Sequence, residues 1–248
     1  MEQLPPEKPT ASFSDIVINV LTSPQDAFEG IKGTASRVGL WFIPLLLLII
    51  LAGVSFSVMM TNETLKEQFM EAQKQAVQAS VESGRMTQAQ ADQQAEGMAQ
   101  MGGIFLAIGL VGIVITLSLI FFGAALFLWL MGKFVLKAPD GYSKYLELYG
   151  LSTWIGVLGI IVNVLMMIGL NTIYASPSAA LAVYANYNPL DLTHRLLSTL
   201  NIFSIWQMVI VGIGLAKLSN KSITFGVAAS CILWLLWVAG SQALGFAR

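Results

Sequence analysis

Long stretches of apolar residues without a charged side chain alternate with short polar stretches along this chain. Five stretches contain no Asp, Glu, Lys or Arg, and each is long enough to cross the ~30 Å hydrocarbon core as a helix of about 20 residues. Helices are expected because every backbone N–H and C=O in lipid must be satisfied within its own segment. The predicted spans are residues 40–60, 104–131, 148–171, 196–216 and 223–244.

The longest of these stretches continues beyond its span into a segment with two prolines and several tyrosines. Proline at the first turn favours a helix start, and tyrosines favour the headgroup level of a membrane. The segment after residue 171 is therefore predicted to be an interfacial loop with one short helix starting at Pro177.

Residues 62–101, between the first two spans, are polar and rich in the helix formers Gln, Ala and Glu. Apolar residues recur there at alternating spacings of four and three, which is typical of a coiled-coil seam. Gly84 fits a helix C-cap and Thr87 an N-cap, so the segment is predicted to form an antiparallel helical hairpin whose arms continue the flanking spans. It serves either as a binding surface or as a spacer. The candidate seam residues are Leu65, Phe69, Ala72, Ala76, Ala91, Ala95 and Met98.

The N-terminal region divides into two parts ahead of the membrane domain of residues 37–248. Residues 1–11 are polar and proline-rich and are predicted to be a disordered tail. Residues 12–36 are predicted to form two short amphipathic helices that restart at Pro24, with Ser12 and Asp15 at capping-box spacing. The same pattern fits a helix lying on the membrane surface and a helix docked on the protein's own spans.

Composition and charge narrow the function classes. Apolar residues make up 56% of the chain and charged residues 11%, whereas soluble domains have about 45–50% and about 25%. The fold class is therefore an all-α polytopic membrane protein with an extracytoplasmic helical hairpin. A net charge of −1 provides no basic field for nucleic acid, and one cysteine, Cys231, allows no internal disulfide.

The distribution of Lys and Arg gives the orientation. On the side of the membrane that holds residues 62–101 there are five of these residues, three of them in that acidic segment. The opposite side, which holds the N-terminus, has more. Because basic residues favour the cytoplasm, the N-terminus is assigned to the inside and the C-terminus to the outside. That cytoplasmic side carries eight basic residues: Lys8, Lys32, Arg37, Lys133, Lys137, Lys144, Lys217 and Lys221.

Catalytic chemistry is not apparent in the sequence. His194 is the single histidine and lies outside the spans, and neither HExxH nor a glycine-rich nucleotide motif is present. We therefore expect no enzymatic activity, no cofactor and no metal. Asn163, Asn201 and Gln207 are neutral polar residues within spans, where they either bond across a helix interface or form a lipid or solute site.

The predicted cytoplasmic entry to the third span combines tyrosines with two opposite charges. An ion pair between Lys144 and Glu147 is possible at their i,i+3 spacing. The cluster is either an interfacial anchor or a surface for a headgroup or partner. Its members are Tyr142, Lys144, Tyr145, Glu147 and Tyr149.

Three stretches together resemble the Yip1 domain family: SPQDAFEGI at residues 23–31, the segment 142–153, and NIFSIWQMVIVGIGL at residues 201–215. The resemblance covers most of the chain outside residues 62–101. It implies a five-helix bundle with a cytoplasmic N-terminus, here in a bacterial inner membrane. Eukaryotic relatives act in vesicle trafficking and bind small GTPases of the Rab type. The DLYGP motif of those relatives is absent, and no proline follows Tyr149-Gly150, so GTPase binding is not carried over.

Two functions remain as hypotheses. The first is non-enzymatic membrane organisation or scaffolding through protein or lipid contacts. The alternative is a lipid or small-solute transporter or channel that uses the neutral polar residues of the bundle. The expected partners are the lipid bilayer and either a membrane protein or a second copy of the chain, without nucleic acid or metal.

Overall fold

Four long apolar helices form the body of the protein in a computed structural model that describes residues 12–101 and 104–244. They are α3 (Gly39–Thr61), α6 (Ile104–Leu130), α7 (Tyr142–Leu170) and α10 (Ile223–Leu244), and each is long and apolar enough to cross a membrane. Large apolar side chains such as Val111 and Leu119 are exposed along them, as expected of surfaces that face lipid. The prediction of an all-helical polytopic membrane fold is confirmed.

The second and third spans are longer than the sequence predicts. The apolar helix α6 continues through a π-helical turn, η1 (Met131–Val135), and α7 begins at Tyr142 rather than at residue 148. The first turns of α7 can carry the charged residues Lys144 and Glu147 because the segment at Thr34–Arg37 bonds to them.

The fourth predicted span, residues 196–216, is divided in the structure. Leu192–Thr199 form a separate helix, α8, and α9 begins at Ile202 and ends at Leu218. The Asn201 side chain accepts hydrogen bonds from the N–H groups of Phe203 and Ser204 and so caps α9. At 1.5 Å per residue, α9 is about 26 Å long, which is shorter than the predicted span.

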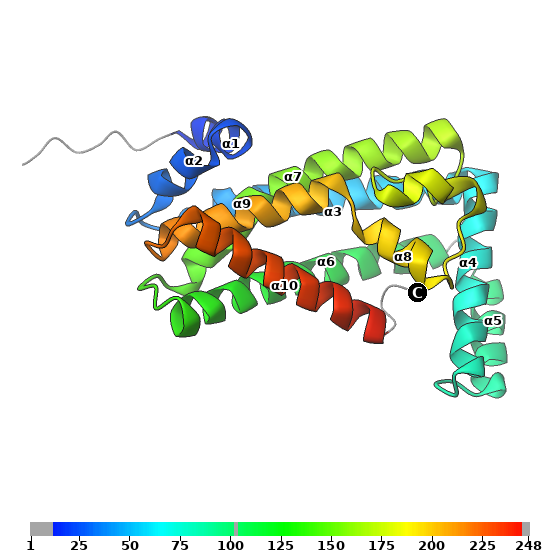
Figure 1. Ribbon diagram of the computed structural model, residues 1–248. Coiled ribbons are helices and arrows are strands. Elements are labelled where there is room, and N and C mark those ends of the chain that lie inside the picture. Colours follow the sequence, from blue (N-terminus) through cyan, green and yellow to red (C-terminus); the bar gives the residue numbers. More distant parts are fainter. Residues whose placement is uncertain (1–11, 102–103, 245–248) are drawn as a thin grey trace, which may run out of the picture.

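The short helix α9 packs between α7 and α10 (Figure 1). Its contact with α10 is very close, since a Cβ added to Gly226 would lie 2.2 Å from the carbonyl oxygen of Gly212. The Ser230 hydroxyl donates a hydrogen bond to the Met208 carbonyl across this interface, at 2.9 Å. Small residues here let two helix backbones meet, as they commonly do in membranes.

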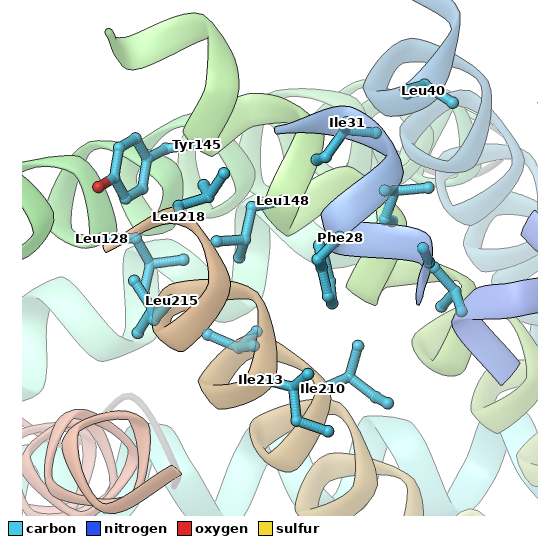
Figure 2. Packing of buried hydrophobic residues seen from close by; sticks show 14 of the residues in the cluster. Phe28, Ile31, Leu40, Leu128, Tyr145, Leu148, Ile210, Ile213, Leu215 and Leu218 are labelled. Atoms are coloured by element: carbon cyan, nitrogen blue, oxygen red, sulfur yellow. The ribbon is translucent and has the colours of Figure 1, made fainter. Parts of the chain in front are cut away.

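Two short helices cover one end of the bundle (Figure 1). They are α1 (Phe13–Thr22), which begins with the predicted capping box of Ser12 and Asp15, and α2 (Pro24–Ile31). Phe28 is fully buried and points toward Leu148 of α7 and toward α9 (Figure 2). Of the two alternatives for this segment, the structure shows helices docked on the protein's own spans.

Two polar helices lie at the opposite end of the bundle (Figure 1). They are α4 (Glu63–Glu82) and α5 (Gln88–Met101), which contact each other and are joined through Gly84 in a left-handed conformation with φ +71°. Asn62 adopts an extended conformation between α3 and α4 and caps α4 through the N–H of Leu65. The two helices therefore turn across the end of the bundle (Figure 1), which corrects the prediction that the arms continue the flanking spans.

Candidate functional site

The charged pair at the start of α7 is buried. Lys144 Nζ lies 2.6 Å from a carboxylate oxygen of Glu147, and the two side chains are 6% and 0% exposed. Lys144 also donates to the Thr34 hydroxyl at 3.3 Å, and the N–H of Arg37 donates to Glu147. The pair thus ties the segment between α2 and α3 to α7.

The tyrosines of this cluster also contact other helices of the same chain. Tyr142 donates to the Phe122 carbonyl at 3.0 Å, and the ring of Tyr149 lies 5.1 Å from that of Phe121. Tyr145 is fully buried against Gly132 of η1, where any added side chain would collide with it.

The structure therefore corrects the hypothesis of a partner-binding surface at this position. Lys144 and Glu147 are inaccessible because the segment between α2 and α3 bonds to them, and Tyr145 is inaccessible because it is buried against η1. Their contacts within the protein fit the other alternative, an anchor built from tyrosines and one ion pair.

The candidate seam residues of α4 and α5 differ in burial. Leu65 and Ala91 are buried, Phe69, Ala72 and Ala76 are half-buried, and Ala95 is exposed, while the side chain of Met98 lies outside the described residues. Phe69 packs on Phe56 of α3, with ring centroids 6.2 Å apart. Ala95 is thus not part of a buried seam, and the best packed part of α4 is the part next to the bundle.

Gln68 connects α4 to the loop between α7 and α8 through two hydrogen bonds to the loop backbone. Gln68 Nε2 donates to the Asn171 carbonyl at 3.2 Å, and Gln68 Oε1 accepts from the Ile173 N–H at 3.0 Å. The side-chain amide therefore bonds to one carbonyl and one N–H of the loop backbone. These two hydrogen bonds hold the loop beside α4.

Replacing Gln68 with alanine is expected to loosen this loop. The half-buried N–H of Ile173 would lose its partner, at a cost of about 1–3 kcal/mol, while the exposed Asn171 carbonyl can bond to water instead. Hydrogen exchange of the Ile173 amide should become faster by roughly tenfold or more. Gln78→Ala, at an exposed position of the same helix, is the matched control and should leave that rate unchanged. Equal exchange rates in the two variants would contradict the contact.

An open cleft of about 630 Å³ lies between α4 and this loop. Both sides of the cleft carry polar or aromatic groups and none of its lining residues is basic. They are Glu67, Gln68, Glu71, Gln75, Tyr174, Tyr187, Asn188, Pro189 and Leu190.

The loop side of the cleft is an ordered column of rings. Tyr174 stacks on Tyr187 with centroids 4.8 Å apart, and Tyr187 lies 5.6 Å from the His194 ring. Tyr187 shares a hydrogen bond with Ser198 at 2.8 Å, and His194 Nδ1 accepts from the Asn188 N–H at 3.0 Å. These contacts hold the rings in place.

The electrostatic environment of the cleft is negative. Burial raises the pKa of the Tyr174 phenol, and the nearby Tyr187 and Glu71 raise it further because they disfavour a second negative charge. At the start of α8, the N–H of His194 donates to Asp191, and this hydrogen bond lowers the pKa of that carboxyl.

The comparison with known proteins identifies the family. A family model described as the Yip1 domain matches residues 18–242. The chain belongs to the Yip1 domain family. The match begins within α1 and ends within α10, so it includes all of the helices between them. No curated protein and no solved structure matches the chain.

Within this Yip1 domain, the neutral polar residues have local roles. Asn201 caps α9, and Gln207 donates to the Ser152 hydroxyl of α7 at 3.5 Å. Asn163 is half-buried on α7. Gln207 thus joins α9 to α7, which is the ordinary use of such groups in membranes.

The cleft of this Yip1 domain could not be predicted from the sequence. Its acids are part of the predicted hairpin, and its tyrosines are part of the predicted interfacial loop. Their proximity depends on contacts between α4 and the loop, among them the bonds of Gln68 and of Asn62. The only local signal is that Glu67 and Glu71 are four residues apart and so share one face of α4. In the part of the chain that the structure describes, no group of three or more His, Cys, Asp or Glu is placed to hold a metal ion.

Proposed function

We propose that this Yip1 domain protein organises a membrane without catalysing a reaction, by holding a partner protein on the surface of α4 and α5. The partner is either another membrane protein or a second copy of this chain. The observation that carries the proposal is that these two helices are largely exposed and yet firmly attached to the bundle at their base.

The α4–α5 pair presents a large polar surface on a fixed base. Charged residues such as Lys66, Lys74 and Glu82 are exposed, and Met70 adds an apolar side chain that is 37% exposed. The base is held by the buried Leu65 and by the bonds of Gln68 to the loop. A rigid, exposed surface favours binding because less conformational freedom is lost when a partner docks.

A non-enzymatic role fits the placement of the single histidine. The ring of His194 packs near Tyr187, and its Nδ1 accepts a hydrogen bond from the N–H of Asn188, so the imidazole supports the loop backbone.

We further propose that the protein lies in a bacterial inner membrane, with the N-terminus in the cytoplasm and with α4–α5 and the C-terminus outside. The excess of Lys and Arg on the α1–α2 side supports this orientation.

The test replaces residues 72–95 with a short Gly/Ser linker, which removes most of the α4–α5 surface but keeps Leu65 and Gln68. The matched control inserts the same linker after Gly84, so that both helices remain. Partners are identified by cross-linking mass spectrometry in native membranes, and copies of the chain are counted by native mass spectrometry.

Wild type and the insertion control should give the same partners or the same oligomer, and the deletion variant should lose them. An unchanged set of neighbours and an unchanged oligomeric state in the deletion variant would refute the proposal.

A further inference from the structure

We propose that the cleft between α4 and the loop before α8 binds a small organic cation, an ammonium group with short apolar substituents. This site lies on the loop side of α4 and is separate from the α4–α5 surface proposed above to hold a protein. The proposal rests on the size of the cleft, on its charge, and on its aromatic wall.

The size fits a small ligand. The volume of about 630 Å³ lies within the range of about 300–1,000 Å³ that is usual for small-molecule sites. The cleft is open, so a cation attached to a larger molecule also has access to it. Pro189 and Leu190 provide apolar surface at its edge for methyl or methylene groups.

The charge of the cleft selects a cation. Glu67 and Glu71 lie one helical turn apart on the same face of α4, and both line the cleft. Gln75 donates one hydrogen bond to Glu71, at 3.2 Å, which positions the carboxylate and leaves further lone pairs for a ligand. The influence of Glu71 on the pKa of Tyr174 shows that the negative field extends across the cleft to the opposite wall.

The aromatic wall selects an organic cation over a metal ion. Tyr174 ends the column of rings, and among the described residues no third ring covers its other face. A tyrosine face attracts an ammonium group through the ring quadrupole, and aromatic cages beside carboxylates are a common way to bind quaternary ammonium ligands. A hard cation such as Ca²⁺ would need six to eight oxygen ligands, whereas two carboxylates and amide groups line this cleft.

The same chemistry is available from two sources. One is a free amine in solution, and the other is the headgroup of an amine-bearing phospholipid. The second is accessible because α4 begins at Glu63, directly after the end of the α3 span at Thr61, which places the cleft near the membrane surface.

The experiment uses the full chain purified in a nonionic detergent. Isothermal titration with choline and with tetramethylammonium measures binding, and sodium chloride at equal ionic strength is the control ion. Native mass spectrometry from bilayer discs of phosphatidylethanolamine, phosphatidylcholine or phosphatidylglycerol then shows whether a lipid headgroup occupies the same site.

Four variants make the test specific. Glu71→Gln removes one charge and Tyr174→Leu removes the aromatic face, whereas Tyr174→Phe keeps the face and reports on folding. Glu82→Gln lies on the same helix, is exposed, and is outside the cleft. Tyr174→Leu and Glu71→Gln should each weaken choline binding by about five- to thirty-fold. Glu82→Gln should bind as wild type does, and Tyr174→Phe should recover most of the binding that Tyr174→Leu loses.

Each outcome decides the question. Retention of amine-bearing lipids, lost in Tyr174→Leu, assigns the site to a headgroup, and choline binding without lipid retention assigns it to a free amine. If wild type shows no saturable binding beyond that of sodium, or if Glu71→Gln and Glu82→Gln bind alike, the cation site is refuted. Loss of partners in the linker experiment does not depend on this result, so the two proposals fail separately.

Discussion

Replacing Glu147 with glutamine is expected to lower the free energy of unfolding by about 3 kcal/mol or more. Removing one partner of a buried ion pair leaves the other charge unpaired, and such changes cost about 3–5 kcal/mol. Here the remaining charge is Lys144, whose side chain is 6% exposed and lies beneath the segment between α2 and α3. Thermal unfolding of the purified protein, followed by circular dichroism, measures the loss.

Two controls separate this effect from a general effect of charge removal. Glu29 forms ion pairs with Lys32 and Lys217 at 3.8 and 3.6 Å, but its side chain is 53% exposed. Because exposed pairs contribute about 0–1 kcal/mol, Glu29→Gln should change stability very little.

The second control removes both charges of the buried pair. Lys144→Met combined with Glu147→Leu leaves no unpaired charge, and apolar replacements of buried pairs are often neutral or stabilising. The double variant should therefore be more stable than Glu147→Gln. Similar losses in Glu147→Gln and Glu29→Gln would show that the Lys144–Glu147 pair is exposed to water.

The spans follow from the sequence because a charge-free apolar stretch is a local property. The α3 and α10 spans begin and end within one residue of the predicted positions. The hairpin turn follows for the same reason, since Gly84 and the cap at Thr87 act on their immediate neighbours.

Features that depend on distant contacts could not be predicted. The division before α9 depends on Ile202 donating to the Pro177 carbonyl and on Ala179 donating to the Leu200 carbonyl, both from the loop. The partners of Gln68 lie 103 and 105 residues away along the chain. Lys144 and Glu147 were recognisable as a pair, but their burial depends on the segment at Thr34–Arg37, more than 100 residues earlier.

Replacing Gly226 with alanine is the second change with a large expected effect. The new Cβ would lie 2.2 Å from the Gly212 oxygen and 2.7 Å from the Ala216 Cβ, so α10 must move away from α9. Overpacking of this kind costs about 1–3 kcal/mol, and a leucine at the same position should cost more. The loss should appear as a lower midpoint of thermal unfolding.

Gly240→Ala is the matched control on the same helix, because nothing lies within 4 Å of a Cβ added there. Alanine is a better helix former than glycine by up to about 1 kcal/mol, so this variant should be as stable as wild type or more stable. The two substitutions are chemically identical and differ only in the distance to α9. If both raise stability, the backbones of α9 and α10 are not in contact. If only Gly226→Ala lowers it, the small residues at Gly212, Gly226 and Ser230 are what attaches the last helix to the bundle.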